Sequence, residues 1–339
     1  MENVSVIECH TPGEVPEELE LGKAPVVLKG LVNDWPIVKA AGQSNASGVA
    51  YLKHFYNGRP TIVCKLHPDR KGRLFYNDDY TRLDYESYRG RVDDTLDAIY
   101  EQIGASHPFG YYIASNVIKT HFPGMDVENS LALPRAESEE VSDETVSIWI
   151  GNATTASCHY DALENIACCV AGRRRFTLFP PDQVNNLYPG PLEPTPGGQV
   201  ISLVDFKDPD FNRFPGFREA LNNAQYAELD PGDALYLPSM WWHHVEGLEP
   251  FNLLINYWWT DAAKYMTSGM NALYMAMLGI RDKPKHERDA WKCLFDYYIF
   301  EGHEKASAQL PEKARGLLEK VDATSARKLR ALLINSLNR

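Results

Sequence analysis

Residues 158–179 read CHYDALENIACCVAGRRRFTLF, and the pattern in this stretch indicates a β fold. It contains two short runs typical of β-strands, CHYDALENIACCV and RRFTLF, which belong to a series that begins near residue 109. The other runs of the series are FGYYIASNV, TVSIWIG, DALYLP and FNLLINYWW. Clusters of turn residues separate these runs. Short strands at such close spacing favour a sandwich or barrel over alternating β–α units, so we expect a mainly β fold.

Length and composition are those of an ordinary folded protein. The chain has 339 residues, of which 44% are hydrophobic, 11% aromatic and 24% charged. This profile excludes disordered, collagen-like and coiled-coil proteins. Lys and Arg number 34 against 46 Asp and Glu, which leaves a formal net charge of -12. A protein this acidic does not favour a phosphate backbone, so we expect no nucleic-acid partner.

The sequence predicts neither a membrane span nor a signal peptide. No window approaches the roughly 18 uncharged apolar residues of a membrane helix, and residues 1–5 (MENVS) lack the basic flank and apolar core of a signal peptide. The six cysteines are scattered and form no CxxC pair, which indicates reduced, mostly buried thiols. We therefore expect a cytoplasmic protein without a membrane partner.

The pattern along the chain predicts two regions. Residues 87–104 carry apolar side chains at helical spacing and form the one helix predicted in the first half. Residues 25–38 predict a short strand that leads into a surface loop, and residues 180–218 a long excursion from the β scaffold of the kind that is usually functional. The pattern after the last strand is helical. We therefore expect a β domain with N-terminal flanking elements at 1–259 and a helical region at 260–339.

The helical region is rich in Met and aromatic side chains. Its first helices carry more apolar surface than a lone short bundle needs. Two interpretations stay open. The apolar surface packs against a second copy of the chain, which would make the protein a homodimer through its C-terminal helices, or it covers one end of the β core.

Two histidines and an aspartate are the candidate metal ligands. Residues i and i+2 of a strand point to the same face, so His159 and Asp161 would project together into the interior of a barrel. His243, in the distant segment WWHHV, completes two nitrogens and one carboxylate on one triangular face. Such a set suits Fe(II) and leaves open positions for substrate and dioxygen, which is typical of an oxygenase. The neighbouring His244 is the other candidate for the third ligand.

The alternation in RRFTLF predicts a buried cation. If Phe176 and Leu178 face the core, Arg174 lies on the same inward face. A buried guanidinium needs an anion, which could be a protein carboxylate or the distal carboxylate of a bound dicarboxylic acid. The same parity places two amides, Asn165 and Asn256, on the ligand side. The alternative is that these polar groups pair with one another in a private network.

The chain resembles the JmjC and cupin-like Fe(II)/2-oxoglutarate oxygenases, and among them the branch that includes the factor-inhibiting-HIF asparaginyl hydroxylase and bacterial cupin-like proteins. The resemblance spans roughly residues 25–260. It is carried by the blocks PVVLKGLVNDWP, GYYIASN, CHYDALENIACCVAGRRRFTLFPPDQVNNLYPGP, PGDALYLPSMWWHHV and NLLINYWW. The resemblance implies a double-stranded β-helix (jelly-roll) core with flanking helices and a C-terminal helical bundle.

The resemblance also implies roles for individual residues. His159, Asp161 and His243 would hold Fe(II) and act as the catalytic set, with the third ligand placed immediately after the tryptophan of the family's Trp-His-x-Val pattern. The residues implied to bind the cosubstrate 2-oxoglutarate are Arg174, Tyr112, Asn165 and Asn256. Two positions depart from the family pattern.

The usual cosubstrate lysine falls at Arg174, which keeps the charge but needs more room. The threonine that often shares this contact falls at Ala156, with Thr154 and Thr155 nearby as replacements. The primary hypothesis is a hydroxylase that acts on a C–H bond of a protein, peptide or small molecule and releases succinate and CO2. A cupin-like metal or small-ligand sensor that has lost turnover is the alternative, and a purely structural scaffold is the third possibility.

Overall fold

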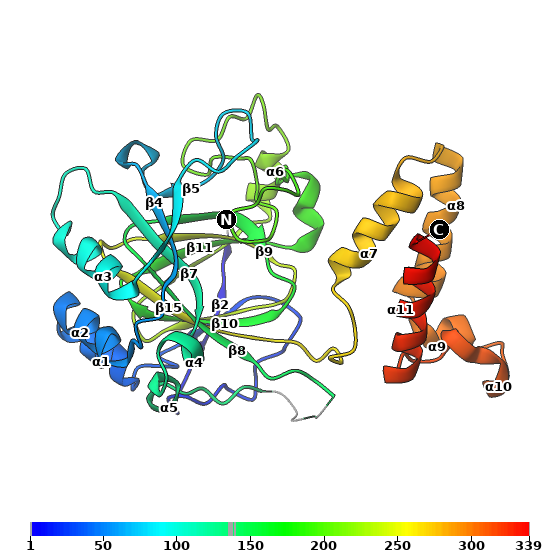
Figure 1. Ribbon diagram of the computed structural model, residues 1–339, viewed down its shortest axis with the longest axis horizontal. Helices are drawn as coiled ribbons and strands as arrows, with labels where there is room; N and C mark the ends of the chain where they lie inside the picture. Colours follow the sequence, from blue (N-terminus) through cyan, green and yellow to red (C-terminus); the bar gives the residue numbers. More distant parts are fainter. Residues whose placement is uncertain (1, 135–137, 139, 339) are drawn as a thin grey trace. The chain divides into compact units, whose positions relative to one another are not determined.

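The computed structural model describes residues 2–134, 138 and 140–338. The chain divides into two compact units, Met1–Ala136 with Asp143–Thr260 and Glu137–Ser142 with Asp261–Arg339. The first unit is built from β-strands and the second from helices (Figure 1). Among the described residues, no helix has both the length and the apolar character needed to cross a membrane.

The described strands of the first unit form two large mixed sheets, one of six and one of nine strands. The six-stranded sheet has the order β1 (Glu2–Asn3), β12 (Gln225–Leu229), β11 (Arg174–Phe179), β14 (Trp242–Gly247), β9 (Thr155–Tyr160) and β5 (Arg73–Leu74). The nine-stranded sheet has the order β2 (Ser5–Glu8), β3 (Val26–Lys29), β13 (Ala234–Leu237), β10 (Glu164–Ala171), β15 (Asn252–Trp259), β8 (Thr145–Gly151), β7 (Gly110–Val117), β4 (Thr61–Leu66) and β6 (Glu86–Gly90). Most neighbouring strands pair antiparallel, and three pairs are parallel.

One apolar cluster joins the inner faces of the two sheets. Phe176 and Leu178 of β11 pack in this cluster with Ala167 and Cys169 of β10, and the side chains between them in sequence point away. The two sheets therefore face each other as a jelly-roll-like sandwich (Figure 1). The expectation of a mainly β, jelly-roll core with C-terminal helices is confirmed.

A second, larger apolar cluster covers the outer face of the nine-stranded sheet. The longest helices that contribute to it are α1 (Pro36–Gln43), α2 (Asn45–Phe55) and α3 (Val92–Glu101). Buried side chains such as Ile37 and Leu52 pack there against strand residues that alternate with the inward-facing ones. The helices thus cover the outer face of the nine-stranded sheet and do not fill the space between the two sheets, where the candidate metal ligands lie.

The first two helices correct the sequence-based prediction. Residues 25–38 predict a strand that leads into a surface loop, but the chain enters α1 at Pro36 and continues into α2. Pro36 stands in the first turn of α1, where its fixed φ suits a helix, and the Ser44 side chain caps α2 by accepting the Ser47 N–H at 3.1 Å. The helix predicted at 87–104 begins only at Val92, because residues 86–90 form strand β6.

The remaining helices are short, apart from those of the C-terminal unit. In the first unit these are α4 (Ile118–His121), α5 (Met125–Glu128) and α6 (Phe217–Asn222). The second unit contains α7 (Gly269–Ala276), α8 (Lys285–Phe295), α9 (Gly302–Ser307), α10 (Glu312–Arg315) and α11 (Ala323–Leu337). A capping box formed by Asp322 and Ser325 begins α11.

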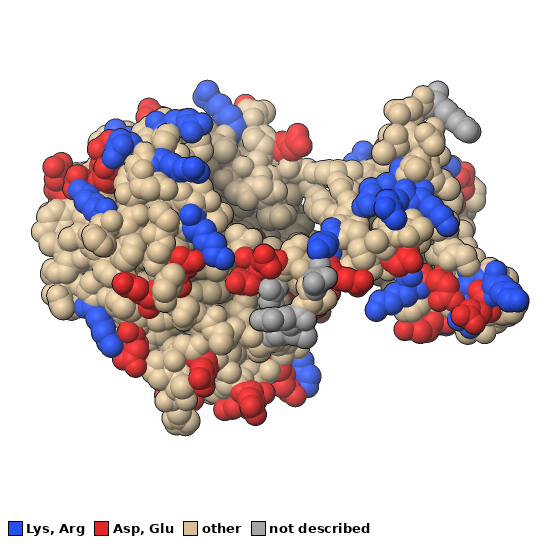
Figure 2. All heavy atoms as spheres, turned by 60° about the horizontal axis from the view of Figure 1, so that its bottom comes forward, with Lys and Arg blue, Asp and Glu red and all other residues tan. Residues whose placement is uncertain are grey.

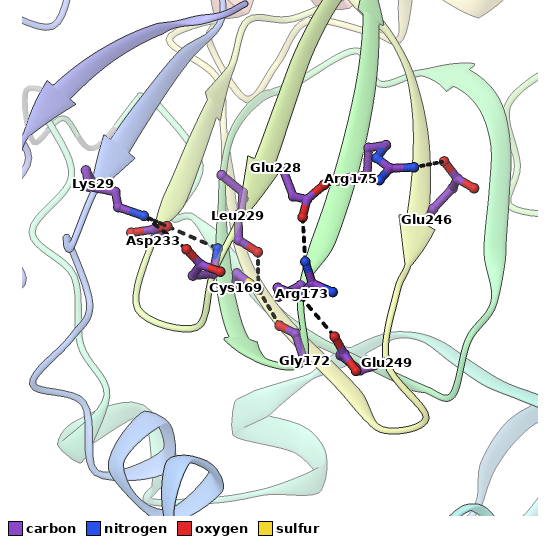
Figure 3. Close-up of polar contacts among 11 residues, drawn as sticks. Lys29, Cys169, Gly172, Arg173, Arg175, Glu228, Leu229, Asp233, Glu246 and Glu249 are labelled. Atoms are coloured by element: carbon purple, nitrogen blue, oxygen red, sulfur yellow. Dashed lines mark hydrogen bonds and ion pairs between the residues drawn. The ribbon is translucent and has the colours of Figure 1, made fainter. Parts of the chain in front are cut away.

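A buried carboxylate ties β3 to the turn between β12 and β13. Asp233 is 3% exposed, and its carboxylate accepts hydrogen bonds from Lys29 Nζ at 2.7 Å and from the Gly30 and Asp230 N–H groups at 3.0 Å each (Figure 3). Three donors satisfy both oxygens, so the charge is stable in a buried place.

We expect Asp233→Ala to lower the free energy of unfolding by about 3 kcal/mol, because it leaves two backbone N–H groups without their acceptor and leaves Lys29 only its longer contact with Asp230, at 3.3 Å. Urea unfolding followed by circular dichroism measures this loss. The matched control is Glu20→Ala, which removes a carboxylate from a pair with Lys23 in which both side chains are about two-thirds exposed, and we expect it to change stability by less than about 1 kcal/mol. Equal effects of the two substitutions would contradict this account.

Candidate metal centre

Two facing histidines and one aspartate come together between the sheets. His159 of β9 and His243 of β14 are paired across the two antiparallel strands, and their ring centroids lie 4.2 Å apart. The Asp161 Oδ2 lies 3.7 Å from His243 Nε2. One ligand atom from each of the three residues lies within 4.8 Å of the others. The structure therefore brings together the three ligands proposed from the sequence.

Asp161, the candidate carboxylate ligand, lies in the turn after β9 and not in the strand itself. β9 ends at Tyr160, so Asp161 is the first residue after the strand. Its carbonyl oxygen accepts the Met240 N–H at 2.7 Å, and Met240 has a left-handed backbone with φ of 67°. This contact links the turn after β9 to the segment that leads into β14. The paired strands β9 and β14 and the hydrogen bond between Asp161 and Met240 therefore hold the aspartate and the two histidines together.

Backbone carbonyls set the tautomer of both histidines. Nδ1 of His159 lies 2.8 Å from the Ser157 oxygen, and Nδ1 of His243 lies 3.0 Å from the Trp241 oxygen. A carbonyl oxygen can only accept, so each Nδ1 carries the hydrogen and each Nε2 presents its lone pair. Burial, with the neighbouring His159, lowers the pKa of His243 to about 4, so this imidazole is neutral at pH 7.

The chemistry of this donor set fits a divalent transition metal. Two imidazole nitrogens and one carboxylate on one face form the pattern used by Fe(II) in oxygenases, in which the remaining positions stay open. Within the described part of the chain, no other group of three His, Cys, Asp or Glu side chains lies close enough to hold a metal. The site is therefore a candidate metal centre.

The centre lies at the junction of two cavities. The larger, of about 480 Å³, is bounded partly by the loop after β11 through Gln199 and Ile201. The smaller, of about 50 Å³, ends at Arg174. The residues that line both cavities are Tyr112, Trp149, Ala156, His159, Asp161 and Trp258. A molecule on the metal can therefore reach Arg174 on one side and open space on the other.

Arg174 differs from the arginines on either side of it. Arg173 donates to Glu228 at 2.8 Å and to Glu249 at 2.9 Å, and Arg175 donates to Glu228 at 3.1 Å, all on the outer face of the sheet (Figure 3). Arg174 points inward, is 5% exposed, and forms no ion pair with any carboxylate that the structure describes. Its Nε has no hydrogen-bond partner.

The inward orientation predicted for Arg174 is thus present, and the protein carboxylate considered as its counter-ion is absent among the described residues. Burial lowers the pKa of this guanidinium, but an arginine does not lose its proton in a protein. A cation in this position is stable only with an anion beside it. The end of the small cavity is therefore suited to a carboxylate.

A directed chain of hydrogen bonds crosses the floor of the small cavity. Trp149 Nε1 donates to Asn256 Oδ1 at 2.7 Å, and Asn256 Nδ2 lies 3.4 Å from Asn165 Oδ1. An indole can only donate, so this chain fixes the orientation of both amides. The private network considered from the sequence is therefore present in part, although both asparagines also line the cavity.

Tyr112 lines both cavities and is 9% exposed. Burial raises its pKa, so its hydroxyl is a neutral hydrogen-bond donor. Ala156 also lines both cavities, but the two threonines considered as replacements do not. Thr154 Oγ1 donates to the Asn152 oxygen at 3.4 Å, and Thr155 lines a different cavity. No hydroxyl therefore takes the place of the family threonine at these positions.

His244 lies on the opposite face of β14 from the metal centre. Its ring stacks on Phe206 with centroids 4.4 Å apart. Burial and the nearby Arg73 and Lys207 lower its pKa to about 3. His243, and not His244, is thus the histidine that lies beside His159 and Asp161.

Sequence reasoning missed several residues of the larger cavity. Leu74 and Ile201 come from segments far from the ligands in sequence, and no local signal marks them. The inward position of Trp149 could have been predicted from strand alternation, because its neighbours Ile148 and Ile150 face the outer helices. Ser115 has a left-handed backbone with φ of 39° at a break in the β7–β8 register, which sequence patterns do not reveal.

We expect Asp161→Ala and His243→Ala each to weaken the binding of Co(II) by more than about 100-fold, because each removes one of three ligands. Calorimetric titration at pH 7.5 measures the affinity. His244→Phe is the matched control, since it removes an adjacent imidazole but keeps a ring against Phe206. Undiminished binding in Asp161→Ala, or an equal loss in His244→Phe, would show that the metal is held elsewhere.

Comparison with known proteins identifies relatives that carry the same domain. HSPB1-associated protein 1 of Bos taurus is 38% identical over 257 residues, which cover 74% of this chain and 51% of that protein. Lysine-specific demethylase 8 of Xenopus tropicalis is 26% identical over 243 residues, which cover 70% of this chain and 48% of that protein. The chain therefore spans about half the length of these two relatives, and a smaller part of some others.

Among solved structures, the X-ray structure of E. coli ycfD aligns with 95% of this chain and 66% of that chain, at 15% identity and a TM-score of 0.41. A likeness of this strength supports no conclusion. The family model for the cupin-like domain, in contrast, matches residues 12–265, which include the candidate metal centre and every described strand except β1 and β2. These relatives do not single out the factor-inhibiting-HIF branch, which stays a prediction. The chain belongs to the cupin-like domain family.

Proposed function

We propose that this protein is a non-haem Fe(II)/2-oxoglutarate-dependent dioxygenase that hydroxylates a C–H bond of its substrate. The observation that carries the proposal is the position of Arg174. It is a buried cation for which no described residue supplies a counter-ion, and it lines the small cavity together with His159, Asp161 and His243. A dicarboxylic acid that chelates the metal with one end would neutralise Arg174 with the other.

In this proposal the Nε2 atoms of His159 and His243 and the carboxylate of Asp161 hold Fe(II). Bound Fe(II) supplies the activation of dioxygen, by which oxidation of 2-oxoglutarate to succinate and CO2 is coupled to insertion of one oxygen atom into a C–H bond. Arg174 forms charged hydrogen bonds with the distal carboxylate, and Tyr112 donates its neutral hydroxyl to the cosubstrate.

The hydrogen-bonded chain of Trp149, Asn256 and Asn165 fixes the orientation of the polar groups in the proposed cosubstrate pocket. Because Trp149 fixes Asn256 and Asn256 fixes Asn165, the pocket presents the same polar groups each time a ligand enters. The apolar side chains around the metal, such as Phe176 and Leu254, exclude water from the same volume. Positioning and water exclusion are what the protein contributes to this class of reaction.

The substrate in this proposal is a protein, a peptide or a small molecule. The larger cavity is wide enough for a side chain to approach the metal, and it is lined mostly by apolar groups. Relatives named as lysine-specific demethylases act on lysine, as their names state, which favours a protein or peptide substrate. On the face drawn in Figure 2, acidic and basic side chains are interspersed, and neither sign dominates.

We expect Arg174→Gln to raise the Kd of 2-oxoglutarate by about 100-fold, which corresponds to the roughly 3 kcal/mol of a bidentate charged pair. Arg174→Lys should recover part of the affinity, because it keeps the charge without the fork. The measurement is an anaerobic titration of the Fe(II) protein, followed by the visible charge-transfer band that chelation produces. Fe(II) affinity is the control and should not change in either variant.

Two results of the same experiment would contradict the proposal. If wild-type protein binds Fe(II) but gives no band with 2-oxoglutarate, Arg174 serves a structural purpose. If 2-oxoglutarate binds tightly but no succinate forms under air with any tested peptide or without substrate, the protein is a sensor of small ligands. The second outcome would select the alternative function.

The helical unit is proposed to be a separate domain that joins two copies of the chain. Its helices expose large apolar side chains to an unusual degree, with Leu278 and Phe300 each 74% exposed and Ile299 62% exposed. Contiguous apolar surface on soluble proteins marks interaction sites. A cytoplasmic location is also proposed, supported by six cysteines that are all free.

We expect the wild-type protein to be a dimer by light scattering after size-exclusion chromatography, and the double substitution Leu278→Glu with Phe300→Glu to shift it to monomer. The double substitution would bury two carboxylates on each side of the dimer interface, and the cost of removing them from water would exceed the free energy of association. The control is Val127→Glu in α5 of the β unit, which is 77% exposed and should leave the dimer intact. A monomeric wild type would favour the other interpretation, in which these side chains cover the β core.

A further inference from the structure

The larger cavity beside the candidate metal centre has a lining that is almost free of charge. Among the described residues that line it there is no lysine, arginine or glutamate, and Asp161 is its one aspartate. In the proposed function Asp161 is a ligand of the metal, so its carboxylate is not free to pair with a substrate. A cationic side chain that entered this cavity would therefore find no counter-ion in the described part of the chain.

The serine hydroxyls in the lining already have partners. Ser157 Oγ donates to the Leu74 carbonyl oxygen at 2.8 Å, and Ser115 Oγ donates to Ser147 Oγ at 3.3 Å. Outside the residues assigned to the metal and the cosubstrate, the larger cavity offers one free amide, that of the half-buried Gln199. A carboxamide has two donor hydrogens and an acceptor oxygen, so a polar side chain that lost its water here would recover only part of its hydrogen bonds.

The tyrosine and tryptophan rings of the cavity line one side of it. Tyr112 of β7, Trp149 of β8 and Trp258 of β15 come from three adjacent strands of the nine-stranded sheet. The centroid of the Trp149 ring lies 5.7 Å from that of Trp258 and 6.0 Å from that of Tyr112, so the three rings form one continuous wall. Aromatic sites for methylated ammonium groups surround the cation with such rings. Among the described residues, no tyrosine, tryptophan or phenylalanine lines the facing side of this cavity.

The facing side of the cavity is aliphatic. The six-stranded sheet contributes Leu74 of β5 and Ala156 of β9, and the segments that follow β9 and β11 contribute Leu163, Pro196 and Ile201. Ala156, Leu163 and Pro196 are half-buried and so keep accessible surface. An apolar side chain that covered this surface would remove water from it, which is favourable.

The charges of the loaded centre in the proposed function also favour a neutral side chain. A divalent metal, the carboxylate of Asp161, the guanidinium of Arg174 and the two carboxylates of 2-oxoglutarate cancel one another. A neutral centre has no net attraction for an ammonium group. Oxidation of a methyl group on a lysine would nevertheless bring the ammonium to the metal, because the C–H bond to be oxidised adjoins the nitrogen. An aliphatic side chain brings C–H bonds to the metal without any charge to desolvate.

We propose that the substrate presents an aliphatic side chain, such as that of leucine, to the metal through the larger cavity. This inference rests on the proposed function and names its substrate class. In the reaction a C–H bond of that side chain is replaced by a C–OH group. One atom of dioxygen enters this alcohol and the other enters succinate, while the C–H bond and 2-oxoglutarate, which loses CO2, each supply two electrons.

The probes are four peptides of the form Ac-Gly-Gly-X-Gly-Gly-NH2, in which X is leucine, asparagine, lysine or trimethyllysine. Saturation-transfer NMR on the full chain loaded with Zn(II) measures their binding without turnover. We expect the leucine peptide to bind about 10-fold more tightly than each of the others, since only its side chain loses neither hydrogen bonds nor a counter-ion in the cavity. Replacement of Zn(II) by paramagnetic Co(II) should speed the relaxation of the leucine methyl protons, because they lie beside the metal.

A carboxylate added to the cavity should change the preference. Leu163→Glu should raise the affinity of the lysine peptide by about 10-fold and weaken binding of the leucine peptide, because it supplies the missing counter-ion. Leu163→Gln is the matched control, since it has nearly the same shape without the charge and should not favour lysine. Gln199→Glu adds a carboxylate at nearly constant volume on the loop after β11, and it replaces Leu163→Glu if that variant does not fold.

Three results would overturn the inference: no binding of the leucine peptide, equal or tighter binding of one of the other peptides, or leucine methyl protons that relax equally with Zn(II) and Co(II). Failure of the proposed function has a different signature. If the leucine peptide binds beside Co(II) but the Fe(II) protein forms no succinate from 2-oxoglutarate, the dioxygenase is refuted and the cavity still selects aliphatic groups. If the lysine peptide stimulates succinate formation and the leucine peptide does not, the dioxygenase stands and the inference is wrong.

Discussion

The antiparallel pairing of β9 with β14, in the register that sets His159 opposite His243, is the constraint on which the rest of the structure depends. A shift of β9 by one residue against β14 would turn His159 away from the space between the sheets and separate it from His243. The same register aligns β14 with β11, where His243 lies opposite Leu178 and Val245 opposite Phe176. The candidate metal ligands and the core residues therefore share one face of three adjacent strands, and a change in either would disturb the other.

The alternation of strand faces was the property that sequence reasoning could use. It placed Arg174 inward from two neighbouring apolar residues, and the outward arginines beside it pair with Glu228, Glu246 and Glu249 (Figure 3). It also placed the two asparagines on the ligand side. These predictions needed only local pattern, because a period of two is a property of the chain itself.

What the sequence did not reveal depends on contacts between distant segments. The loop that contains Ile201 closes the large cavity from more than 40 residues beyond the ligand His159, and nothing local to either segment records that they meet. The turn that ends at Pro36 favours a loop in the local pattern, whereas the position of Pro36 in the first turn of α1 is equally compatible with a helix.

The packing of the two sheets also explains how the six-stranded sheet can contain buried polar side chains that lack partners. Arg174 without a counter-ion and His244 without a hydrogen-bond partner each reduce the stability of the free protein. Residues in such positions are stabilised when a ligand binds, because a molecule that binds only the folded state adds RT ln(1 + [L]/Kd) to its stability. The well-packed cores on both faces of the nine-stranded sheet supply the stability that permits this. The six-stranded sheet shares the inner cluster through Phe176 and Leu178, and a further cluster that includes Phe179 and Trp242 packs on its other face, so both sheets contribute to the stability that offsets these groups.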